Sequence, residues 1–407
     1  MESSTRSRPR RAWLFSLLMV TFAIGTDDFV VAGALPAISR DLAVSEGTTG
    51  QLVTVFSLAY AFSAPVMAVL TSRVPPRRLL GLGLTLFAAL NFATALATSF
   101  EILLVLRIVT AVVAGTLSPA AFAIAGQRAE PGYAGRAIGV VAAGLTVSLA
   151  VGVPIGTWLS TRWGWHATFV AVGVFTVGAL VTVAATLPRF EPVSEAGIGD
   201  RLRALRSPAI LACAVTTTIG ACAGLMPYIY VAPISEALTA RPELLTVFIA
   251  TIGVAGALGA AVGGHIADGW GPDRGMIATF GTALVVVLVW VGLHATVAPV
   301  PPVVIMGSLA VWGVAAWSNN APMNARTLAL AGPVGTEAMA LNTSGLYVGM
   351  ACGSAIGGLV LDRFGVTGTL LAAIGIGVCG VAAMVISVRR WPTGRPARGK
   401  AGKKARV

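Results

Sequence analysis

The chain has 407 residues, of which 56% are hydrophobic and only 11% are charged, and its formal net charge is +12 at pH 7. Soluble proteins carry about 25% charged residues, so this composition excludes a soluble globule and a disordered chain. The basic residues sit in short connections and at both ends, with no basic stripe and no interleaved aromatic residues for base stacking. We therefore expect no nucleic-acid partner.

Apolar segments follow one another along the chain, each long enough for a helix to cross a bilayer core of about 30 Å. The first segment contains two acids and is too long for the apolar core of a signal peptide, so we expect it to be retained. The sequence predicts an all-α polytopic membrane protein with twelve transmembrane helices. The predicted spans are 13–36, 48–71, 79–99, 102–126, 137–160, 165–187, 209–233, 244–267, 275–297, 301–325, 338–360 and 366–388.

The distribution of basic residues predicts the orientation of these spans. With the N-terminus inside, 23 of the 28 Lys and Arg fall on inner loops and tails, whereas 4 fall outside and one, Arg107, falls within a span. This asymmetry follows the positive-inside rule and places both termini in the cytoplasm, with the protein in the cell membrane. The predicted organisation is a basic tail (1–12), a first six-helix half (13–187), a cytoplasmic linker (188–208), a second six-helix half (209–388) and a second basic tail (389–407).

Two weak internal matches support a division into halves. The fifth span ends in GTWLSTRWGWHATF and the eleventh ends in GGLVLDRFGVTGTL, so that Gly164 and Gly365 are 201 positions apart. The segments LPAIS and APIS place Pro36 and Pro233 at nearly the same offset, 197 positions. Parallel halves of this kind enclose a central site that opens alternately to each side of the membrane.

Charged residues deep in the spans are the strongest functional signal, because a charge at the bilayer centre costs about 2.5–3.5 kcal/mol on insertion scales. Asp27, Asp28 and Arg107 are the residues that we place there. Neighbouring helical positions diverge by about 100°, so the two carboxylates cannot point equally into one cavity. We favour Asp28 over Asp27 as a carboxylate that exchanges protons; the alternative is a structural ion pair with Arg107.

Polar and aromatic residues cluster in several spans and are candidates for binding a small amphiphilic molecule. Any one of them alone fits helix packing or an interfacial position equally well. The candidate substrate-binding residues are Tyr60, Asn91, Tyr228, Tyr230, Trp312, Trp317, Asn319, Asn320 and Tyr347. The four cysteines (Cys213, Cys222, Cys352 and Cys379) lie in apolar runs and are expected to be small buried residues, and the three scattered histidines indicate no metal site. No cofactor is expected.

Two inner connections and one span carry further motifs. The second-to-third connection, TSRVPPRR, contains Arg73, Arg77 and Arg78, and the eighth-to-ninth, GGHIADGWGPDR, contains Gly264, Asp268, Gly271 and Arg274. Ordinary positive-inside topology explains the arginines, whereas Asp268 suggests a helix cap or an ion pair. The fifth span contains GVPIGTW, in which Gly152, Pro154 and Gly156 combine a bend with a surface for close helix packing. Gly349, Gly353 and Gly357 form a second such surface in the eleventh span.

Together these segments resemble the major facilitator superfamily over almost the whole chain outside the two tails. The match is most similar to its twelve-span drug:proton antiporters, the chloramphenicol and arabinose-type efflux permeases. It is carried by GTDDFVVAGALPAISRDL (25–42), Arg107, GVPIGTWLSTRWGWHATF and GGHIADGWGPDR. The resemblance implies that Asp28 is the embedded acid, that Arg107 is the buried arginine of the fourth span, and that GVPIG is the antiporter motif. It also assigns gating roles to the two inner connections, although Ser72 stands where the family has aspartate and Thr110 where it has glutamine.

The resemblance and the buried charges favour a secondary transporter, and we expect no enzymatic activity. The expected function is export of a small amphiphilic drug or metabolite, with a chloramphenicol-like antibiotic as one example, in exchange for protons. The alternative is a proton-coupled importer of a sugar or another small nutrient. The expected partners are the small-molecule substrate, protons and the lipid bilayer, and the protein is expected to act as a monomer.

Overall fold

The computed structural model describes residues 12–71, 73–129, 134–188, 207–297, 299–332 and 335–393. The predicted basic tails lie almost entirely outside these residues, as do most of the predicted linker and Ser72. The described residues are mostly helical and contain no strands. The helices alternate in direction, so the bundle has two ends. We call the end where the described chain begins and finishes the terminal end, and the opposite end the far end.

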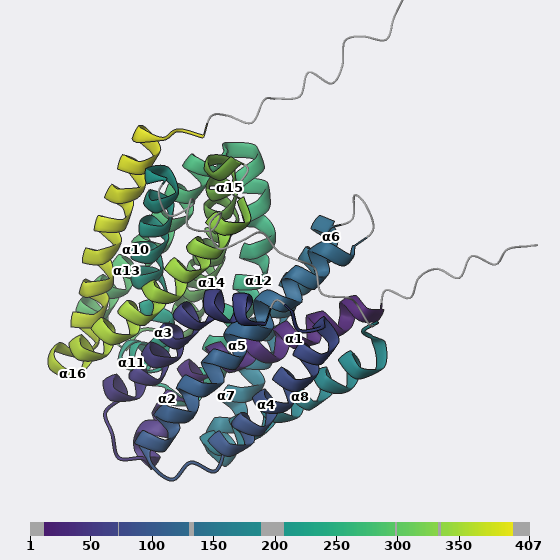
Figure 1. The fold of residues 1–407 in the computed structure, drawn as a ribbon. Coiled ribbons are helices and arrows are strands. Elements are labelled where there is room, and N and C mark those ends of the chain that lie inside the picture. The colour runs from purple at the N-terminus through teal and green to yellow at the C-terminus, as the bar shows by residue number, and fades with distance from the viewer. Residues whose placement is uncertain are drawn as a thin grey trace, which may run out of the picture.

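The first half of the chain forms six membrane-crossing units (Figure 1). Each unit corresponds to one predicted span, with ends shifted by a few residues. Two of the units are divided, the first at Val30 and the fifth by a π-helical turn. The units are α1 (Ala12–Phe29) with α2 (Val31–Asp41), α3 (Glu46–Leu70), α4 (Pro76–Thr94), α5 (Phe100–Arg128), α6 (Ala134–Val147) with η1 (Ser148–Gly152) and α7 (Val153–Trp163), and α8 (Trp165–Thr186).

The second half repeats this order beside the first. Its first unit is divided at Tyr230, as the first unit of the chain is at Val30. The units are α10 (Pro208–Ile229) with α11 (Val231–Thr239), η2 (Pro242–Leu244) with α12 (Leu245–Trp270), α13 (Pro272–Thr296), α14 (Pro302–Ser318) with α15 (Asn320–Ala331), and α16 (Gly335–Arg390). α16 supplies the last two units, because its 56 residues cross the bundle twice around a bend at Gly365.

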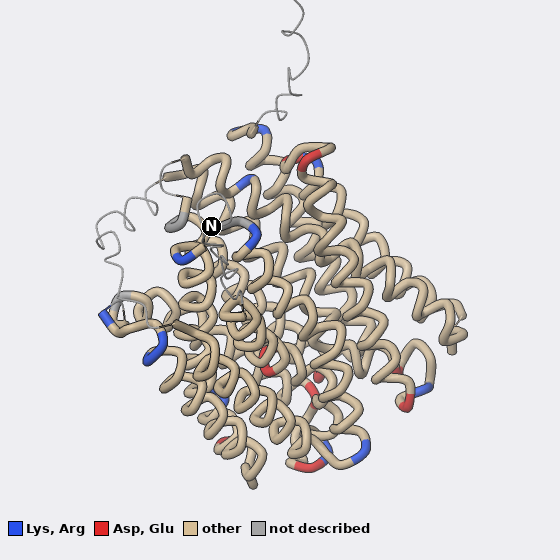
Figure 2. The backbone as a smooth tube through the Cα atoms, turned by 90° about the vertical axis from the view of Figure 1, so that its right-hand side faces the viewer, with Lys and Arg blue, Asp and Glu red and all other residues tan. Residues whose placement is uncertain are grey.

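Ten described segments are long and apolar enough to span a membrane, and one of them is the doubled α16. The remaining unit is α4, a helix of 19 residues that packs between α5 and α8. The prediction of twelve transmembrane helices in two six-helix halves is therefore confirmed. Figure 2 shows that the charged residues gather at the two ends of the bundle and that only a few lie between them. A low charged fraction is therefore compatible with ends that face water.

The predicted repeat is visible in the backbone and in a hydrogen bond. Gly164 and Gly365 both adopt positive φ, 82° and 65°, where one helix ends and the next begins. Glycine has no Cβ and adopts such φ values without the strain that other residues incur. The Thr168 hydroxyl donates to the carbonyl of Gly156 at 2.7 Å, and the Thr369 hydroxyl donates to the carbonyl of Gly357 at 3.5 Å. Both members of this second pair lie 201 positions after the first, the same offset as the two glycines.

Large apolar side chains are exposed on the outer surface of the bundle, as expected for a protein surrounded by lipid. Large apolar side chains such as Leu96, Val303 and Phe364 are at least 70% exposed, which suits contact with lipid. The expectation that all four cysteines are buried is wrong for Cys352 and Cys379, which are exposed, whereas Cys213 and Cys222 are buried. In a bilayer an apolar residue is stable on the outer surface of the bundle, so an apolar run alone does not show which residues face inward.

The contacts between the halves begin at the far end and continue past the middle of the bundle. α3 lies along α16, α2 contacts α11, and η1 and α7 pack against α12. The approach of η1 to α12 is close enough that a Cβ on Gly253 would lie 2.0 Å from the carbonyl oxygen of Leu149. Further toward the terminal end, the Ser344 hydroxyl donates to the carbonyl of Ala61 at 3.4 Å. At the terminal end itself, α6 leans away from the second half in Figure 1.

Candidate functional site

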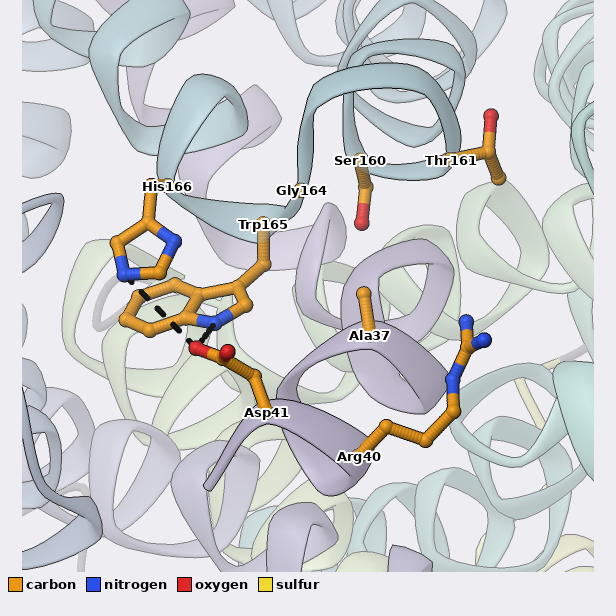
Figure 3. A pocket seen from close by; sticks show the side chains of 8 residues that line it. All are labelled: Ala37, Arg40, Asp41, Ser160, Thr161, Gly164, Trp165 and His166. Atoms are coloured by element: carbon orange, nitrogen blue, oxygen red, sulfur yellow. Dashed lines mark hydrogen bonds and ion pairs between the residues drawn. The ribbon is translucent and has the colours of Figure 1, made fainter. Parts of the chain in front are cut away.

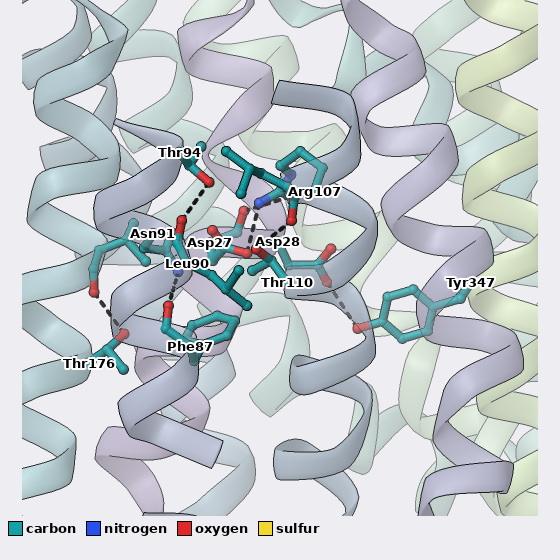
Figure 4. Close-up of polar contacts among 12 residues, drawn as sticks. Asp27, Asp28, Phe87, Leu90, Asn91, Thr94, Arg107, Thr110, Thr176 and Tyr347 are labelled. Atoms are coloured by element: carbon teal, nitrogen blue, oxygen red, sulfur yellow. Dashed lines mark hydrogen bonds and ion pairs between the residues drawn. The ribbon is translucent and has the colours of Figure 1, made fainter. Parts of the chain in front are cut away.

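Asp27 and Asp28 occupy the last turn of α1, just before the break at Val30. Both side chains are buried, with exposed fractions of 0% and 5%. The Thr26 hydroxyl donates to the carbonyl of Phe22 at 2.8 Å, and the Val30 amide donates to the carbonyl of Thr26 at 3.0 Å, so the helix is intact through this region. The two carboxylates consequently point in different directions and meet different partners (Figure 4).

Asp27 is held by Arg107 of α5. The Arg107 guanidinium donates through Nη1 to Asp27 Oδ2 at 2.8 Å and through Nη2 to the Asp27 carbonyl at 3.3 Å. The guanidinium also lies 4.1 Å from the centre of the Phe56 ring, a cation–π contact. The exposed fraction of Arg107 is 1%. Asp27 is thus held by an ion pair, a backbone contact and a cation–π contact of its partner, and its Oδ1, like that of Asp28, has no hydrogen-bond partner among the described residues.

Asp28 faces the other half of the bundle. The hydroxyl of Tyr347, on α16, donates to Asp28 Oδ2 at 3.0 Å. Tyr347 in turn stacks on Tyr60 of α3, with ring centres 3.9 Å apart. Among the described residues, the second oxygen of Asp28 has no hydrogen-bond partner. The carboxylate therefore joins the halves through one neutral donor and keeps a free oxygen that can receive a proton.

An aromatic cluster from the second half lies against the break in α1. Tyr228 packs edge-on against Phe29 at 5.7 Å and against Trp317 at 5.6 Å, and Trp317 packs against Trp312 at 5.8 Å. The Tyr228 hydroxyl also points to the carbonyl of Phe29 at 3.4 Å. Five of the predicted binding residues are thus grouped around Asp28 and Phe29. They are Tyr60, Tyr347, Tyr228, Trp317 and Trp312.

The structure places the other candidate binding residues elsewhere. The Tyr230 hydroxyl donates to the carbonyl of Ser354 at 2.6 Å, in the contact between the halves at the far end. The Asn91 amide donates to Phe87 of its own helix at 3.0 Å. Asn319 accepts from Thr279 of α13 at 3.0 Å, and Asn320 accepts from Asn324 one turn later at 2.9 Å. Three of these residues make contacts within their own half and Tyr230 lies in the far-end contact between the halves, so none of the four joins the aromatic cluster in this conformation.

The glycine–proline motif of the fifth span packs directly on the helix that carries the acids. Pro154 has no amide hydrogen and so removes one helical hydrogen bond, and the preceding residues form the π-helical turn η1. A Cβ on Gly152 would lie 2.1 Å from Thr26 Oγ1, and one on Gly156 would lie 2.4 Å from Val30 Cγ2. Both glycines therefore let α7 and η1 contact the residues on either side of Asp27 and Asp28.

The glycines of α16 make a similar contact, but within one half. A Cβ on Gly349 would lie 2.2 Å from the carbonyl oxygen of Thr218, and one on Gly353 would lie 2.4 Å from that of Cys222. Both of these carbonyls belong to α10, which is also in the second half. This glycine face therefore packs α16 closely against α10, and Tyr347 and Tyr228 both belong to this pair of helices.

A carboxylate from the second half closes the far end of the bundle. Asp362 of α16 accepts from the hydroxyl of Ser45 at 2.7 Å and from the amide of Gly47 at 3.2 Å. These donors belong to the start of α3, where helical amides lack partners within the helix and favour negative charge. The Ser354 hydroxyl adds a second link to the carbonyl of Gly50 at 2.5 Å. We call Ser45, Gly47, Gly50, Ser354 and Asp362 the far-end clasp.

Loss of the Asp362 carboxylate is expected to loosen the far-end clasp. For Asp362→Ala we expect the closed population to fall relative to the open one by roughly fivefold, because an exposed charged hydrogen bond contributes about 1 kcal/mol. Spin labels at Trp163→Cys and Thr296→Cys, one exposed far-end site in each half, report the distance between the halves in a background without native cysteines. Glu243→Ala is the control, since Glu243 forms an ion pair with its neighbour Arg241 and belongs to no contact of the clasp. An unchanged distance distribution in Asp362→Ala would contradict the clasp.

The predicted gating connections lie at the terminal end. Arg73 is exposed, and Arg77 donates to the carbonyl of Ala184 at 2.5 Å, within the first half. Arg78 lies in the first turn of α4. In the second half, Gly271 separates α12 from α13 with φ of 83°, Gly264 lies on α12, and Asp268 and Arg274 are exposed on either side of the turn.

The sequence analysis missed one buried charge, Arg326. Its exposed fraction is 1%, because α15 continues to Ala331 and places Arg326 inside the helix, whereas the predicted span ends at 325. Arg326 pairs with Asp273 at the start of α13 and donates to Ser387 Oγ at 3.0 Å and to the Trp391 carbonyl at 2.9 Å. The sequence offered one indication of this ion pair, because Asp273 follows Gly271 by two positions and is an acid that needs a partner if it is buried.

We expect Arg326 to contribute strongly to stability. Arg326→Met leaves Asp273 without its cation and removes the donors to α16, and loss of one partner of a buried pair costs about 3–5 kcal/mol. Thermal unfolding of the purified protein in detergent measures the effect. Arg274→Met, a change at an exposed neighbour, is the control and should unfold at the wild-type temperature. Equal midpoints for the two variants would show that the ion pair contributes nothing measurable.

Comparison with known proteins identifies the family. The family model of the Major Facilitator Superfamily matches residues 17–336. The chain belongs to the major facilitator superfamily. A chloramphenicol resistance protein of Streptomyces lividans is 30% identical over 356 residues, which are 86% of this chain and 89% of that one. A chloramphenicol efflux pump of Mycobacterium tuberculosis is 28% identical over 371 residues, 89% of each.

A solved structure agrees with the fold of this major facilitator. A bacterial homologue of the human lysosomal transporter Spinster, crystallised in an inward-facing and unoccupied conformation, superposes with a TM-score of 0.76 at 16% identity, covering 96% of this chain and 100% of that chain. Membership of the superfamily makes this chain a multi-pass transporter of the cell membrane that moves a small molecule.

Proposed function

We propose that this major facilitator exports a small amphiphilic compound, with chloramphenicol as the first candidate, in exchange for protons. The observation that carries the proposal is the division of labour between the adjacent acids. Asp27 is paired with Arg107 inside the first half, whereas Asp28 contacts Tyr347 across the two halves. At this position, the protonation of the acid and the relative position of the halves affect each other, because the contact with Tyr347 depends on both.

The contact of Asp28 with Tyr347 provides a physical basis for coupling. An ionised carboxylate accepts a stronger hydrogen bond from a tyrosine hydroxyl than a neutral carboxyl group does. After Asp28 releases its proton, the contact with Tyr347 holds the halves in the present arrangement until a substrate replaces it. An empty, unprotonated carrier therefore does not reverse its conformation, and protons do not leak without export of substrate.

With both termini in the cytoplasm, the far-end clasp closes the outer side and the conformation is inward-facing. Asp28 then releases its proton to the cytoplasm as the substrate reaches the cluster of Tyr228, Trp317 and Trp312. The halves rock, the substrate leaves to the outside, and Asp28 takes up a proton before the return step. Each entering proton supplies about 2.3 kcal/mol per 100 mV and about 1.36 kcal/mol per unit of pH difference.

The candidate substrate follows from the chemistry of the cluster and from the relatives. Tyr228, Trp312 and Tyr60 of the cluster are buried in this conformation. When a substrate displaces their present contacts, three aromatic rings and the hydroxyls of Tyr228, Tyr60 and Tyr347 offer a mostly apolar surface with a few donors, which suits a neutral amphiphile. The relatives from Streptomyces lividans and Mycobacterium tuberculosis are named for chloramphenicol resistance and efflux. One such surface lies between the halves of a single chain, so we propose that the monomer is the transporting unit.

Transport by the purified protein in liposomes tests the proposal. We expect an imposed proton gradient to drive chloramphenicol to the side from which protons enter, and a protonophore to abolish this accumulation. Accumulation on the side that protons reach would instead identify a proton-coupled importer. Growth of cells with and without the protein in a panel of antibiotics tests the substrate class, and unchanged resistance to every compound would remove drugs from the proposal.

A further inference from the structure

A polar pocket lies at the far end of the first half, away from Asp27 and Asp28, and its residue Asp41 precedes Ser45 of the far-end clasp by four positions. It has a volume of about 430 Å³ and lies between the last residues of α2, the end of α7 and the start of α8. Figure 3 shows Arg40 and Asp41 extending from α2 on opposite sides, with Ser160 and Trp165 facing them. We call this cavity the α2–α8 pocket.

One side of the α2–α8 pocket offers donors for an anion. Ser160 lines the pocket and is 3% exposed, and its buried hydroxyl has no hydrogen-bond partner among the described residues. Gly164 opens α8, a helix of 22 residues whose N-terminus no described side chain caps. Such a terminus presents free amides and a partial positive charge. Arg40 adds a full charge, and its Nε donates to the carbonyl of Pro36 at 3.0 Å, which positions the guanidinium at the rim.

The opposite side carries a fixed negative charge. Asp41 Oδ2 accepts from the indole of Trp165 at 2.8 Å and lies 3.9 Å from His166 Nε2. The imidazole stacks on the indole with ring centres 3.9 Å apart, so both partners of the carboxylate are held in place. Asp41 is 52% exposed and retains access to a ligand in the pocket. Charges of both signs therefore line one cavity, which is an arrangement suited to a zwitterion.

Two exposed tryptophans place the pocket at the level of the lipid head groups. Trp158 and Trp163 of α7 are 44% and 65% exposed and pack against each other at 5.2 Å. Exposed tryptophans in membrane proteins gather where the hydrocarbon core meets the head groups. Thr161 and Gly164 of the pocket lie on the same short helix or directly after it. A ligand tethered to acyl chains can thus reach the pocket from the membrane.

We propose that the α2–α8 pocket binds the head group of a zwitterionic phospholipid that carries a primary amine, of the phosphoethanolamine type. The phosphate accepts hydrogen bonds from Ser160, from the first amides of α8 and from Arg40, while the ammonium group pairs with Asp41. A phosphocholine head group has no N–H to donate to Asp41, and a phosphoglycerol head group has no cation at all. The pocket therefore selects for the amine as well as the phosphate.

Native mass spectrometry of the delipidated full chain tests this assignment. The probes are phosphatidylethanolamine, phosphatidylcholine and phosphatidylglycerol with identical acyl chains. We expect the first lipid to bind the wild type roughly tenfold more tightly than the other two, since a hydrogen bond to a charged group changes affinity by about this factor. Equal binding of the three lipids would overturn the proposal.

Three variants separate the two sides of the pocket. Asp41→Asn should bring the affinity for phosphatidylethanolamine down to that for phosphatidylcholine, whereas Ser160→Ala and Arg40→Gln should weaken both lipids. Arg241→Gln removes another exposed far-end arginine and should leave all three affinities unchanged. Circular dichroism checks that each variant is folded. Retained selectivity in Asp41→Asn, or loss of selectivity in Arg241→Gln, would contradict the assignment.

A water-soluble probe distinguishes a lipid from a free zwitterion. Glycerophosphoethanolamine has the same head group without acyl chains, and we expect it to displace the lipid only at concentrations far above those at which the lipid binds. Binding of the soluble probe as tight as that of the lipid would show that the pocket serves a free metabolite and would overturn the lipid assignment.

Discussion

Asp28→Asn is expected to abolish proton-driven accumulation of substrate while preserving passive exchange. Asparagine has nearly the same shape and still accepts a hydrogen bond from Tyr347, but it cannot take up a proton. With one proton exchanged per neutral substrate, a gradient of one pH unit supports about tenfold accumulation, and the variant should show none. Counterflow of labelled chloramphenicol in liposomes should continue, because it needs only binding and rocking.

The control for this experiment is Glu243→Gln, which neutralises an acid that is 59% exposed at the far end and should leave the gradient dependence intact. Tyr347→Phe adds a second comparison, since it keeps the acid and removes the donor that holds it. We expect this variant to leak protons in the absence of substrate, measured by a pH-sensitive dye inside the liposomes. Accumulation by Asp28→Asn with wild-type gradient dependence would remove Asp28 from the coupling mechanism.

Arg107→Met is expected to destabilise the protein by about 3–5 kcal/mol, because it leaves the Asp27 carboxylate buried without its cation. Both side chains of this pair are at most 1% exposed, so water cannot replace the lost partner. Unfolding of the purified protein in detergent, followed by circular dichroism during a denaturant titration, measures the free energy of unfolding.

The double variant Asp27→Asn with Arg107→Met separates the pair from the packing around it. Removing both charges should recover much of the lost stability, since no uncompensated charge then remains in the bundle. If the double variant were as unstable as Arg107→Met alone, the cost would come from lost packing against Phe56. A single variant with wild-type stability would contradict the structural role that we assign to this pair.

Hydropathy was sufficient to predict the spans, because each span must satisfy its backbone within a helix and cover about 30 Å of hydrocarbon, whereas the division into halves came from the internal matches and the family resemblance. The span ends were harder to place. The first span continues to Asp41 and the tenth to Ala331, since these helices extend beyond the apolar run into polar sequence. This extension is why Arg326 was assigned to a loop.

The members of the site could be predicted individually, but their pairing could not. Asp27 and Asp28 stand out in an apolar helix, yet the sequence left open which of them meets Arg107. The partner of Asp28 is 319 positions away on α16, and no local pattern connects the two residues. The far-end clasp was also missed, because Asp362 is an ordinary loop-side acid until the start of α3 is brought against it.

The far-end clasp has a consequence for inhibitor design. On the topology that we propose, with the termini in the cytoplasm, a compound that cannot cross the bilayer meets the outer face of this conformation, where Asp362 is bonded to Gly47. Impermeant molecules such as antibodies or charged peptides must therefore wait for the carrier to open outward. On the proposed function, a drug aimed at Asp28 therefore needs membrane permeability of its own, which is also a property of the amphiphilic compounds that we propose are exported.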